Sequence, residues 1–482
     1  MKIPKEVEFV LKELRGKGFE SYVVGGCVRD VLMNRLPQDW DIATNANPNE
    51  ISSAFKNSFS DNKFGTVTVL TESKDETLKE IEVTPFRTES KYTDKRHPDE
   101  VKWAKTIEED LSRRDFTINS IALGQDKKVI DPFKGKKDIE DKIIRAVGNP
   151  EDRFSEDALR MIRAVRLSAL LQFKIEEKTK EAIKKNSNSI DLISKERVRD
   201  EFLKIIMADK ADEGIELLRT LSLLKYIIPE LQEGFKVGQN KHHVYEVYEH
   251  SILSLKCAAD KKFNMYVRIA SLFHDIGKPR AKRGEGPDST FYGHETIGAK
   301  ITGEILNRLR FSKKDIEKIV KLVRYHLFYY NVDEVSESSV RRLVKNVGQE
   351  NMEELLQVRI CDRIGSGVPK AEPYKLRHLK YVIDKVSQDP ISTKMLEVSG
   401  NDVMSILSIK PSRKVGEVLS VLLSEVLSDP KKNQKKYLEK EIKKLGEMND
   451  RELSSLAKES EEAITKVETK KDEMTKQKYW VT

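Results

Sequence analysis

The chain has 482 residues, long enough for three or four domains of about 100 to 150 residues each. Charged residues make up 35% of it, yet apolar residues recur in periodic patches, so the composition is that of a globular, mostly helical protein and excludes a disordered chain. The net charge of +8 is compatible with a polyanionic partner but does not by itself indicate one.

The N-terminus lacks the apolar stretch of a signal peptide, and no segment has the apolar length needed to cross a bilayer. We therefore expect a cytoplasmic protein. The three cysteines, Cys27, Cys257 and Cys361, are too scattered for a disulfide framework or a thiolate zinc site. We expect them to be reduced packing residues.

Strands are predicted near the start of the chain, where β-branched residues cluster at 21–24, 66–70 and 81–84. Beyond Asp138 apolar residues recur at three- and four-residue spacing, as in 158–167 and 202–206, which predicts helices. The expected fold class is therefore α+β, with a small mixed head of β-sheet and helices followed by all-helical domains. After Gly446 the Lys- and Glu-rich sequence predicts an exposed helix or a frayed tail.

The first motif is a glycine pair, Gly25 and Gly26, between the strand at 21–24 and a helical pattern. Such a turn can bring backbone N–H groups and a helix N-terminus against a triphosphate, with Arg29 one turn further on as a charged clamp. Asp39 and Asp41 follow, one residue apart in a segment that is predicted to be a strand, so that both carboxylates lie on one face. Alone, each motif is typical of an ordinary turn or of solvated acids; together they favour a Mg²⁺ site.

A pair of carboxylates at this position suits nucleotidyl transfer. A 3′-hydroxyl is a poor nucleophile at neutral pH, so one metal ion would acidify it while a second would neutralise charge on the leaving pyrophosphate. Asp39 and Asp41 would be the shared ligands and the catalytic residues.

These residues resemble a known family. The head of the class II CCA-adding tRNA nucleotidyltransferases and bacterial poly(A) polymerases has a similar pattern to Gly25-Gly26-x-x-Arg29-Asp30 followed by Asp39-x-Asp41. Further blocks match in order up to about residue 210. The resemblance implies Mg²⁺ in the head, CTP and ATP as substrates, and tRNA as the partner.

The second block, residues 113–122, could hold only a surface ion pair. The resemblance instead implies that Arg114 contacts the triphosphate, with Asp115 and Asn119 near the ribose. A carboxylate that accepts a hydrogen bond from a 2′-hydroxyl would favour ribonucleotides over deoxyribonucleotides.

The third block runs from Glu156 to Arg166. Without a functional role, it would be an amphipathic helix with ion pairs on its surface. Asp157 and Arg160 are three residues apart and are predicted to share one helix face. Cytosine and adenine both present an amino donor beside a ring-nitrogen acceptor, which an acid and an arginine can match, whereas uracil and guanine present the reverse. By resemblance Asp157 and Arg160 select the base, and Arg163 and Arg166 lie near enough to hold phosphates. Residues 194–201 resemble the family's next block, which would support this helix.

The choice of polymer rests on the polar segment 86–99, which resembles the flexible loop of CCA-adding enzymes. The resulting prediction is addition of C, C and A to the 3′ end of tRNA without a nucleic-acid template. A poly(A) polymerase and an enzyme that adds only A remain alternatives.

A second set of candidate metal ligands lies further along the chain. His274 and Asp275 are adjacent at the end of an apolar helical run. A lone histidine in such a run is usually a core residue, but the order of these ligands resembles that of HD-domain phosphohydrolases. By that resemblance one divalent ion, a transition metal for example, would be bound by His250, His274, Asp275 and Asp362, and a second by His294 and His326, for phosphate-ester hydrolysis.

Four domains are expected from these motifs: a head at 1–138, a neck and body at 139–235, an HD-type domain at 236–388 and a helical tail at 389–482. The basic run 431–437 in the tail could contact tRNA phosphates, although such runs are more often solvated helix faces. Rival interpretations are a hydrolase or signalling enzyme in which the HD-type domain is the working part, and an RNA-binding protein with decayed sites.

Overall fold

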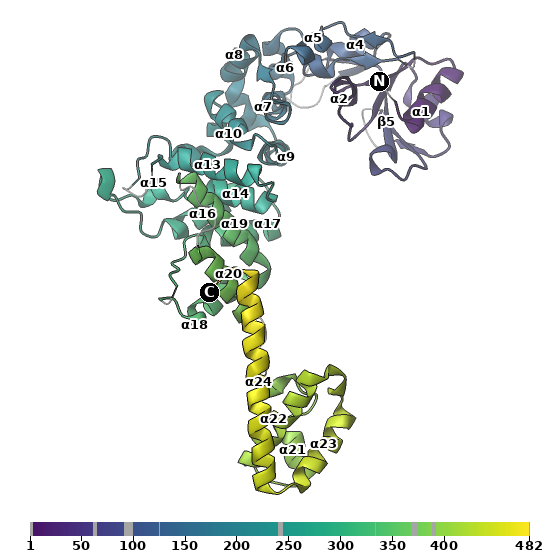
Figure 1. Cartoon of the computed structure of the whole chain (residues 1–482). Coiled ribbons are helices and arrows are strands. Elements are labelled where there is room, and N and C mark those ends of the chain that lie inside the picture. Colours follow the sequence, from purple (N-terminus) through teal and green to yellow (C-terminus); the bar gives the residue numbers. More distant parts are fainter. Residues whose placement is uncertain are drawn as a thin grey trace. The chain divides into compact units, whose positions relative to one another are not determined.

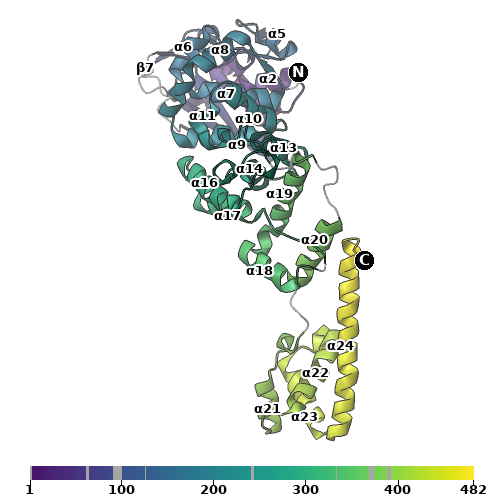
Figure 2. The ribbon, with the colours of Figure 1, turned by 90° about the vertical axis from the view of Figure 1, so that its left-hand side faces the viewer.

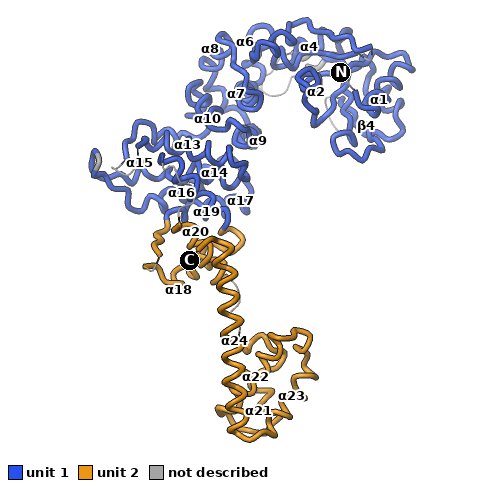
Figure 3. The backbone as a smooth tube through the Cα atoms, in the orientation of Figure 1, with its two compact units in different colours: residues 1–327, 353–369 blue, residues 328–352, 370–482 orange. Residues whose placement is uncertain are grey.

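The computed structural model describes residues 3–60, 65–90, 100–124, 126–239, 244–332, 334–367, 374–387 and 392–481. Most of the predicted flexible loop, residues 91–99, lies outside these ranges. The chain forms two compact units, one of residues 1–327 with 353–369 and one of residues 328–352 with 370–482 (Figure 3). None of the described helices is both long and apolar enough to cross a membrane.

The N-terminal head, coloured purple to blue in Figure 1, contains a sheet. The sheet has seven strands in the order β3-β4-β5-β2-β1-β8-β9. Only β2 and β5 pair in parallel; the other neighbours are antiparallel. The strands are β1 (Ser21–Val24), β2 (Asp41–Thr44), β3 (Ser58–Ser60), β4 (Val67–Leu70), β5 (Glu80–Pro85), β8 (Ala122–Leu123) and β9 (Val129–Ile130). The three strands predicted from β-branched residues are therefore confirmed, with shifts of one residue.

Two apolar clusters belong to the two faces of this sheet, because side chains alternate along each strand. Ile42 of β2 joins a cluster with Val7, Val10, Leu11 and Leu14 of α1 (Lys5–Gly16). The next residue, Ala43, joins a second cluster with residues of the helix that follows the hairpin. The hairpin strands are β6 (Arg87–Ser90) and β7 (Glu100–Trp103), and the remaining head helices are α2 (Gly26–Leu32), α3 (Pro48–Ala54), α4 (Ile107–Ser112) and α5 (Gly135–Glu140).

The neck is helical apart from a short parallel pair of strands, β10 (Ile143–Ile144) and β11 (Lys174–Ile175). Its helices bury the apolar positions that the three- and four-residue spacing identified, such as Phe202, Ile205 and Ile206. They are α6 (Pro150–Glu156), α7 (Leu159–Leu171), α8 (Glu177–Asn186), α9 (Lys195–Ile206), α10 (Ala211–Thr220), α11 (Leu224–Ile227) and α12 (Pro229–Gln232).

The rest of the first unit is a helical layer that carries the second set of candidate ligands. Arg268, only 3% exposed, joins it to the neck by donating hydrogen bonds to the carbonyl oxygens of Ile206 and Ala208 at the end of α9. Its helices are α13 (Val247–Asp260), α14 (Met265–Phe273), α15 (Lys278–Ala281), α16 (His294–Arg308), α17 (Lys313–Tyr325) and α19 (Met352–Gly365).

The second unit is entirely helical in its described residues. Its long C-terminal helix, α24 (Asp450–Lys478), lies alongside α22 (Arg413–Ser428), and the turned view agrees (Figure 2). Leu422, Leu438, Ile442 and Leu453 are fully buried in its core. The sequence after Gly446 is therefore one helix rather than a frayed tail. The other helices are α18 (Glu337–Val347), α20 (Tyr374–Ser387), α21 (Gly400–Leu407) and α23 (Lys435–Glu447). The fold class predicted from sequence is confirmed. The division into four domains does not coincide with the two units, because the predicted HD-type domain at 236–388 has residues in both, and it stays a proposal.

Candidate active sites

The glycine turn lies directly beside the candidate catalytic acid. Val24, the last residue of β1, pairs with Asp41, the first residue of β2. Gly25 follows with a φ of +85°, a conformation that L side chains rarely adopt, and a Cβ atom there would lie 3.0 Å from Arg114 Nη1 and 3.4 Å from Asp41 Oδ2. Glycine is thus required here both for the turn and for the close approach of Arg114 and Asp41.

The two predicted catalytic carboxylates differ in their surroundings. Asp41 begins β2 and is partly buried, but Asp39 lies in an exposed bend before the strand. The prediction that both lie within one strand is therefore wrong, because β2 begins only at Asp41. Trp40, only 4% exposed, packs in the core between them. Burial raises the pKa of Asp41 to about 6; Arg114 opposes that shift, and Asp39 adds to it.

A third carboxylate near this site was missed by the sequence analysis. Glu82 pairs with Asp41 across the parallel β2–β5 pair, so both side chains leave the same face of the sheet, and Glu82 also raises the pKa of Asp41. A partly buried carboxylate that is repelled by two further acids fits a divalent cation with oxygen ligands. Nothing local in the sequence marks Glu82, because the pairing joins residues about 40 positions apart.

Arg114 is held in place by a buried acid at the end of α4. Asp110 is 0% exposed, and its Oδ1 lies 2.8 Å from Arg113 Nη2 while its Oδ2 lies 3.2 Å from Arg114 Nη2. Spacings of three and four residues on a helix are those of neighbouring side chains, so this anchor could have been found in the sequence. Arg113 and Arg114 together keep the pKa of Asp110 below its usual range despite its burial.

The candidate ribose-binding residues form one hydrogen-bonded network with the phosphate clamp. Arg29 Nη1 donates to Asn119 Oδ1 at 2.7 Å, and Asn119 Nδ2 donates to Asp115 Oδ1 at 3.1 Å. Asp115 Oδ2 in turn accepts from Arg163, with an Nε distance of 2.8 Å. The structure thus brings together four predicted site residues from the head and the neck.

Asp115 should make a pH-dependent contribution to stability. Burial would raise the pKa of this acid, but Arg163 and Asn119 outweigh burial and lower it to about 2. An unfolded aspartate titrates near 3.9, so the stabilisation is fully present above about pH 4 and is lost as the pH falls toward 2. We expect Asp115→Asn to lower the free energy of unfolding at pH 7 by on the order of 2 kcal/mol. Urea unfolding followed by tryptophan fluorescence, to which buried Trp40 contributes, measures this loss. An equal loss at pH 3 would contradict the assignment.

The predicted base-selecting pair has a different local structure from the one expected. Asp157 ends α6 with extended backbone, and its Oδ1 accepts from the Leu159 N–H at the start of α7. Asp157 and Arg160 therefore do not share a helix face, because aspartate is a strong helix-capping residue and breaks the helix here. Arg197 of α9 holds Asp157, with a distance of 2.8 Å between Arg197 Nη2 and Asp157 Oδ2.

Arg160 ties the start of α7 to the head. Its Nη2 donates to the carbonyl oxygen of Arg113 at 3.0 Å, and its Nη1 donates to the carbonyl oxygen of Arg153 and to Glu156. These bonds use three of the five N–H groups of the guanidinium. Arg166, the last predicted phosphate ligand, pairs with Glu201 of α9 at 3.2 Å. Residues 194–201 thus support this region through Arg197 and Glu201.

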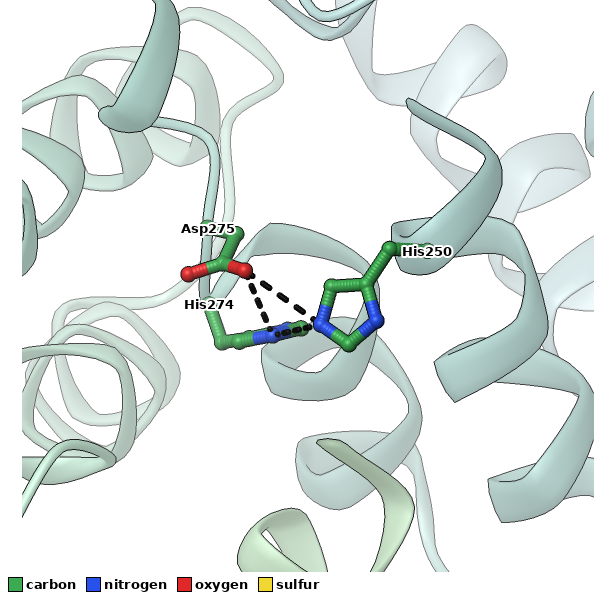
Figure 4. Close-up of side chains that lie close together, drawn as sticks. All are labelled: His250, His274 and Asp275. Atoms are coloured by element: carbon green, nitrogen blue, oxygen red, sulfur yellow. Dashed lines mark hydrogen bonds and ion pairs between the residues drawn. The ribbon is translucent and has the colours of Figure 1, made fainter. Parts of the chain in front are cut away.

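The second set of ligands converges in the helical layer, and Figure 4 shows three of them, His250, His274 and Asp275. The Nε2 atoms of His250 and His274 lie 2.9 Å apart, and each lies 3.2–3.3 Å from Asp275 Oδ2. On the other side, Asp275 Oδ1 lies 3.3 Å from His294 Nε2 and 3.7 Å from His326 Nε2. Asp362 Oδ1 lies 3.3 Å from His250 Nε2. All six predicted HD ligands are therefore together, and Asp275 is shared between two groups.

The orientation of the histidines fits divalent cations. The Nδ1 atoms of His274, His294 and His326 lie 2.7–2.8 Å from the carbonyl oxygens of Ser271, Phe291 and Val323. A carbonyl only accepts, so each Nδ1 carries the proton and each Nε2 presents a lone pair to the centre. Burial lowers the pKa of His250, but Asp275 and Asp362 outweigh burial and raise it to about 9.

Comparison with known proteins agrees with this geometry. Residues 21–145 match the model of the poly A polymerase head domain, residues 172–235 that of the probable RNA and SrmB-binding site of polymerase A, and residues 243–366 that of the HD domain. The CCA-adding enzyme of Ligilactobacillus salivarius is 35% identical over 439 residues, which are 90% of this chain and 95% of that protein. The CCA-adding enzyme of Enterococcus faecalis is 32% identical over 435 residues, or 90% and 94% of the two chains.

A solved structure is also similar. The crystal structure of the Bacillus stearothermophilus CCA-adding enzyme in complex with CTP has a TM-score of 0.57 at 26% identity and covers 92% of this chain and 98% of that chain. The head, the neck and the site between them thus define a nucleotidyltransferase. The chain belongs to the CCA-adding enzyme family. The resemblance inferred from the motifs is confirmed.

Proposed function

We propose that the head adds C, C and A in sequence to the 3′ end of tRNA, using CTP and ATP and releasing pyrophosphate. The convergence of Asp41, Arg114 and the Gly25 turn, with Arg29 nearby, carries the proposal. The names of the similar proteins support CCA addition over poly(A) addition. A tRNA substrate would place the protein in the cytoplasm.

Each residue of the head site has one role in this proposal. Mg²⁺ ions held by Asp39, Asp41 and Glu82 would lower the pKa of the RNA 3′-hydroxyl and neutralise the pyrophosphate. The Gly25–Gly26 backbone, Arg29 and Arg114 would hold the triphosphate, and Arg163 and Arg166 would add positive charge beside it. Asp115 and Asn119, already joined by a hydrogen bond, would bind the ribose.

A gel assay of tRNA that ends before its CCA tests this function. With Mg²⁺, we expect two residues to be added from CTP alone and a third only when ATP is also present. Long tails from ATP alone would make the protein a poly(A) polymerase. Addition only of A, and only to tRNA that already ends in CC, would make it an A-adding enzyme.

Base selection would come from Asp157 and Arg160. Arg197 aims the carboxylate of Asp157, and the unused N–H groups of Arg160 can donate to the ring nitrogen of cytosine or adenine. We expect Asp157→Ala to lower kcat/KM for CTP and ATP by roughly 10- to 100-fold, the usual effect of losing one buried hydrogen-bond partner.

In the Asp157→Ala enzyme, kcat/KM for UTP should fall much less than kcat/KM for CTP. Discrimination between CTP and UTP should therefore decrease. Asp152→Ala, at an exposed position of the same helix α6, is the matched control. Unchanged discrimination in the Asp157→Ala enzyme would contradict the role.

A second activity is favoured by the six converging ligands. We propose that the HD domain hydrolyses phosphate esters, with divalent cations held by His250, His274, Asp275, Asp362, His294 and His326. Such ions would supply an activated water and charge neutralisation. Lys278, whose Nζ lies 2.6 Å from Asp275 Oδ2, would stay beside the reacting phosphate.

The second unit would contact tRNA. Exposed Lys431, Lys435 and Lys436 lie at and before the start of α23 and offer charge to phosphates. Together with the two sites, this surface supports the division of the chain into a head at 1–138, a neck at 139–235, an HD domain at 236–388 and a tail at 389–482.

A further inference from the structure

A cleft of about 830 Å³ opens beside the HD ligands. A water molecule occupies about 30 Å³ in the liquid, so the cleft has room for far more than one phosphate group and matches the size of small-ligand sites. Asp275, His294, His326 and Asp362 line one part of it. The remaining wall decides which phosphate ester could be bound.

One face of α19 forms part of that wall. The cleft is lined by Arg359, Asp362, Arg363 and, directly after the helix, Ser366. Counted from Arg359, the other three follow at three, four and seven residues, which places all four on one side. The opposite side packs closely on α13, where a Cβ atom at Gly365 would lie 2.3 Å from Ser254 Oγ. The cleft-facing side chains are therefore fixed by a tightly packed helix.

Four cationic and three acidic side chains line the cleft, and six of these seven are paired. Lys278 lies 2.6 Å from Asp275, Arg359 lies 2.6 Å from Asp362, and Arg324 lies 3.2 Å from Glu295. The seventh, Arg363, has no ion pair within the described ranges, and its Nε is buried without a hydrogen-bond acceptor. A guanidinium that lines a cleft without a carboxylate partner has N–H groups available to bind a phosphate.

The cleft also offers an aromatic surface. Tyr292 lines it and is 86% exposed, although it lies between Phe291, only 8% exposed, and the candidate ligand His294. An exposed tyrosine that lines a cleft offers an aromatic face on which a base can stack.

We propose that this cleft binds a nucleoside that carries two neighbouring phosphate groups. One phosphate lies at the HD ligands, the second is bound by Arg363, and the base stacks on Tyr292. This inference rests on the assignment of the HD domain as a phosphate-ester hydrolase. The two phosphates are those of a nucleoside diphosphate; in the 5′-phosphorylated end of an oligonucleotide the two phosphates are separated by a ribose, and the test below distinguishes this second source.

Calorimetric titration of the metal-free full-length protein tests the binding directly. The ligands are GDP, GMP, pyrophosphate and the dinucleotide pGpG; guanine is chosen because the head should reject it. We expect GDP to bind at least fivefold more tightly than GMP. Arg363→Ala should weaken both GDP and pyrophosphate about tenfold, whereas Arg310→Ala, whose side chain is 69% exposed outside the cleft, should change neither.

Tyr292→Ala distinguishes the contribution of the base to binding from that of the phosphates. Because Tyr292 is exposed, the substitution should leave the fold intact. We expect it to weaken GDP about tenfold and to leave pyrophosphate unchanged. Whichever of GDP and pGpG binds more tightly identifies the source of the two phosphates. Wild-type affinity for GDP in the Arg363→Ala protein, or equal affinity of the wild type for GDP and GMP, would overturn the proposal.

Hydrolysis by the Mn²⁺-loaded protein keeps the two assignments apart. If no phosphate ester is cleaved but the binding pattern holds, the hydrolase assignment fails and the cleft remains a nucleotide site. p-Nitrophenyl phosphate, which has a single phosphate, should be cleaved equally by the wild type and Arg363→Ala. The role of Arg363 is supported if the Arg363→Ala protein has a higher KM than the wild type only for substrates with two phosphates. The absence of such a rise overturns it.

Discussion

Asp41→Asn should abolish nucleotide addition while leaving the HD domain active. The substitution keeps the shape of the side chain at the start of β2 but removes the charge of a partly buried carboxylate that lies beside Arg114 and across from Glu82. We expect kcat for addition of C to tRNA to fall roughly a thousandfold or more, because losing a residue that merely supports a metal ligand already costs about 10- to 100-fold.

The control for this variant is Asp75→Asn, which changes an exposed carboxylate of the same head that binds only nearby Thr77. It should add CCA at the wild-type rate. Retention of more than about a tenth of the activity by Asp41→Asn at saturating Mg²⁺ would contradict the assignment of Asp41 as a shared ligand. Binding of Mn²⁺ measured in parallel should lose the ions of the head alone.

Asp275→Asn should have the opposite effect: it should abolish phosphate-ester hydrolysis by the HD domain and leave nucleotide addition by the head intact. Oδ2 of Asp275 faces His250 and His274, whereas Oδ1 faces His294 and His326, so one substitution affects both groups of ligands. We expect the HD domain to lose both divalent ions and phosphate-ester hydrolysis to fall at least a hundredfold, which is the upper end of losses for supporting residues alone. CCA addition should continue at the wild-type rate.

Metal content measured by atomic emission, together with hydrolysis of p-nitrophenyl phosphate, checks this expectation. Asp260→Asn, at an exposed position at the end of α13, serves as the matched control. If the HD domain of the Asp275→Asn protein retained two ions, Asp275 would not be a ligand shared by both ions. An unchanged thermal unfolding curve in the absence of metal would exclude misfolding as the cause of lost hydrolysis.

Local motifs were predictable from the sequence, whereas contacts between distant segments were not. The strand, the Gly25 turn and α2 follow one another in the chain, so their order alone places Arg29 in the helix that begins at the glycine turn. Glu82 reaches the same place through parallel pairing of β2 and β5, which no local pattern encodes. The capping of α7 by Asp157 was overlooked because helical periodicity was given more weight than the preference of aspartate for helix ends.

The HD ligands show the same limit. Their order in the sequence identified all six residues, but it divided them between two ions without a bridge. Which oxygen of Asp275 faces which histidine depends on how four helices, α13, α14, α16 and α17, pack together. The pairing of Arg359 with Asp362, and the lack of an ion-pair partner for Arg363 among the residues that the structure describes, likewise depend on the cleft as a whole.

Lys278 and Arg359 have a consequence for how the protein is assembled in a cell. Each buried acid of the HD domain already has a permanent cation beside it, Lys278 for Asp275 and Arg359 for Asp362. If divalent ions bind here as proposed, their removal would leave no bare negative charge in the interior, which would otherwise oppose folding. On that proposal, folding would not require the metal, and the ions could be loaded reversibly afterwards.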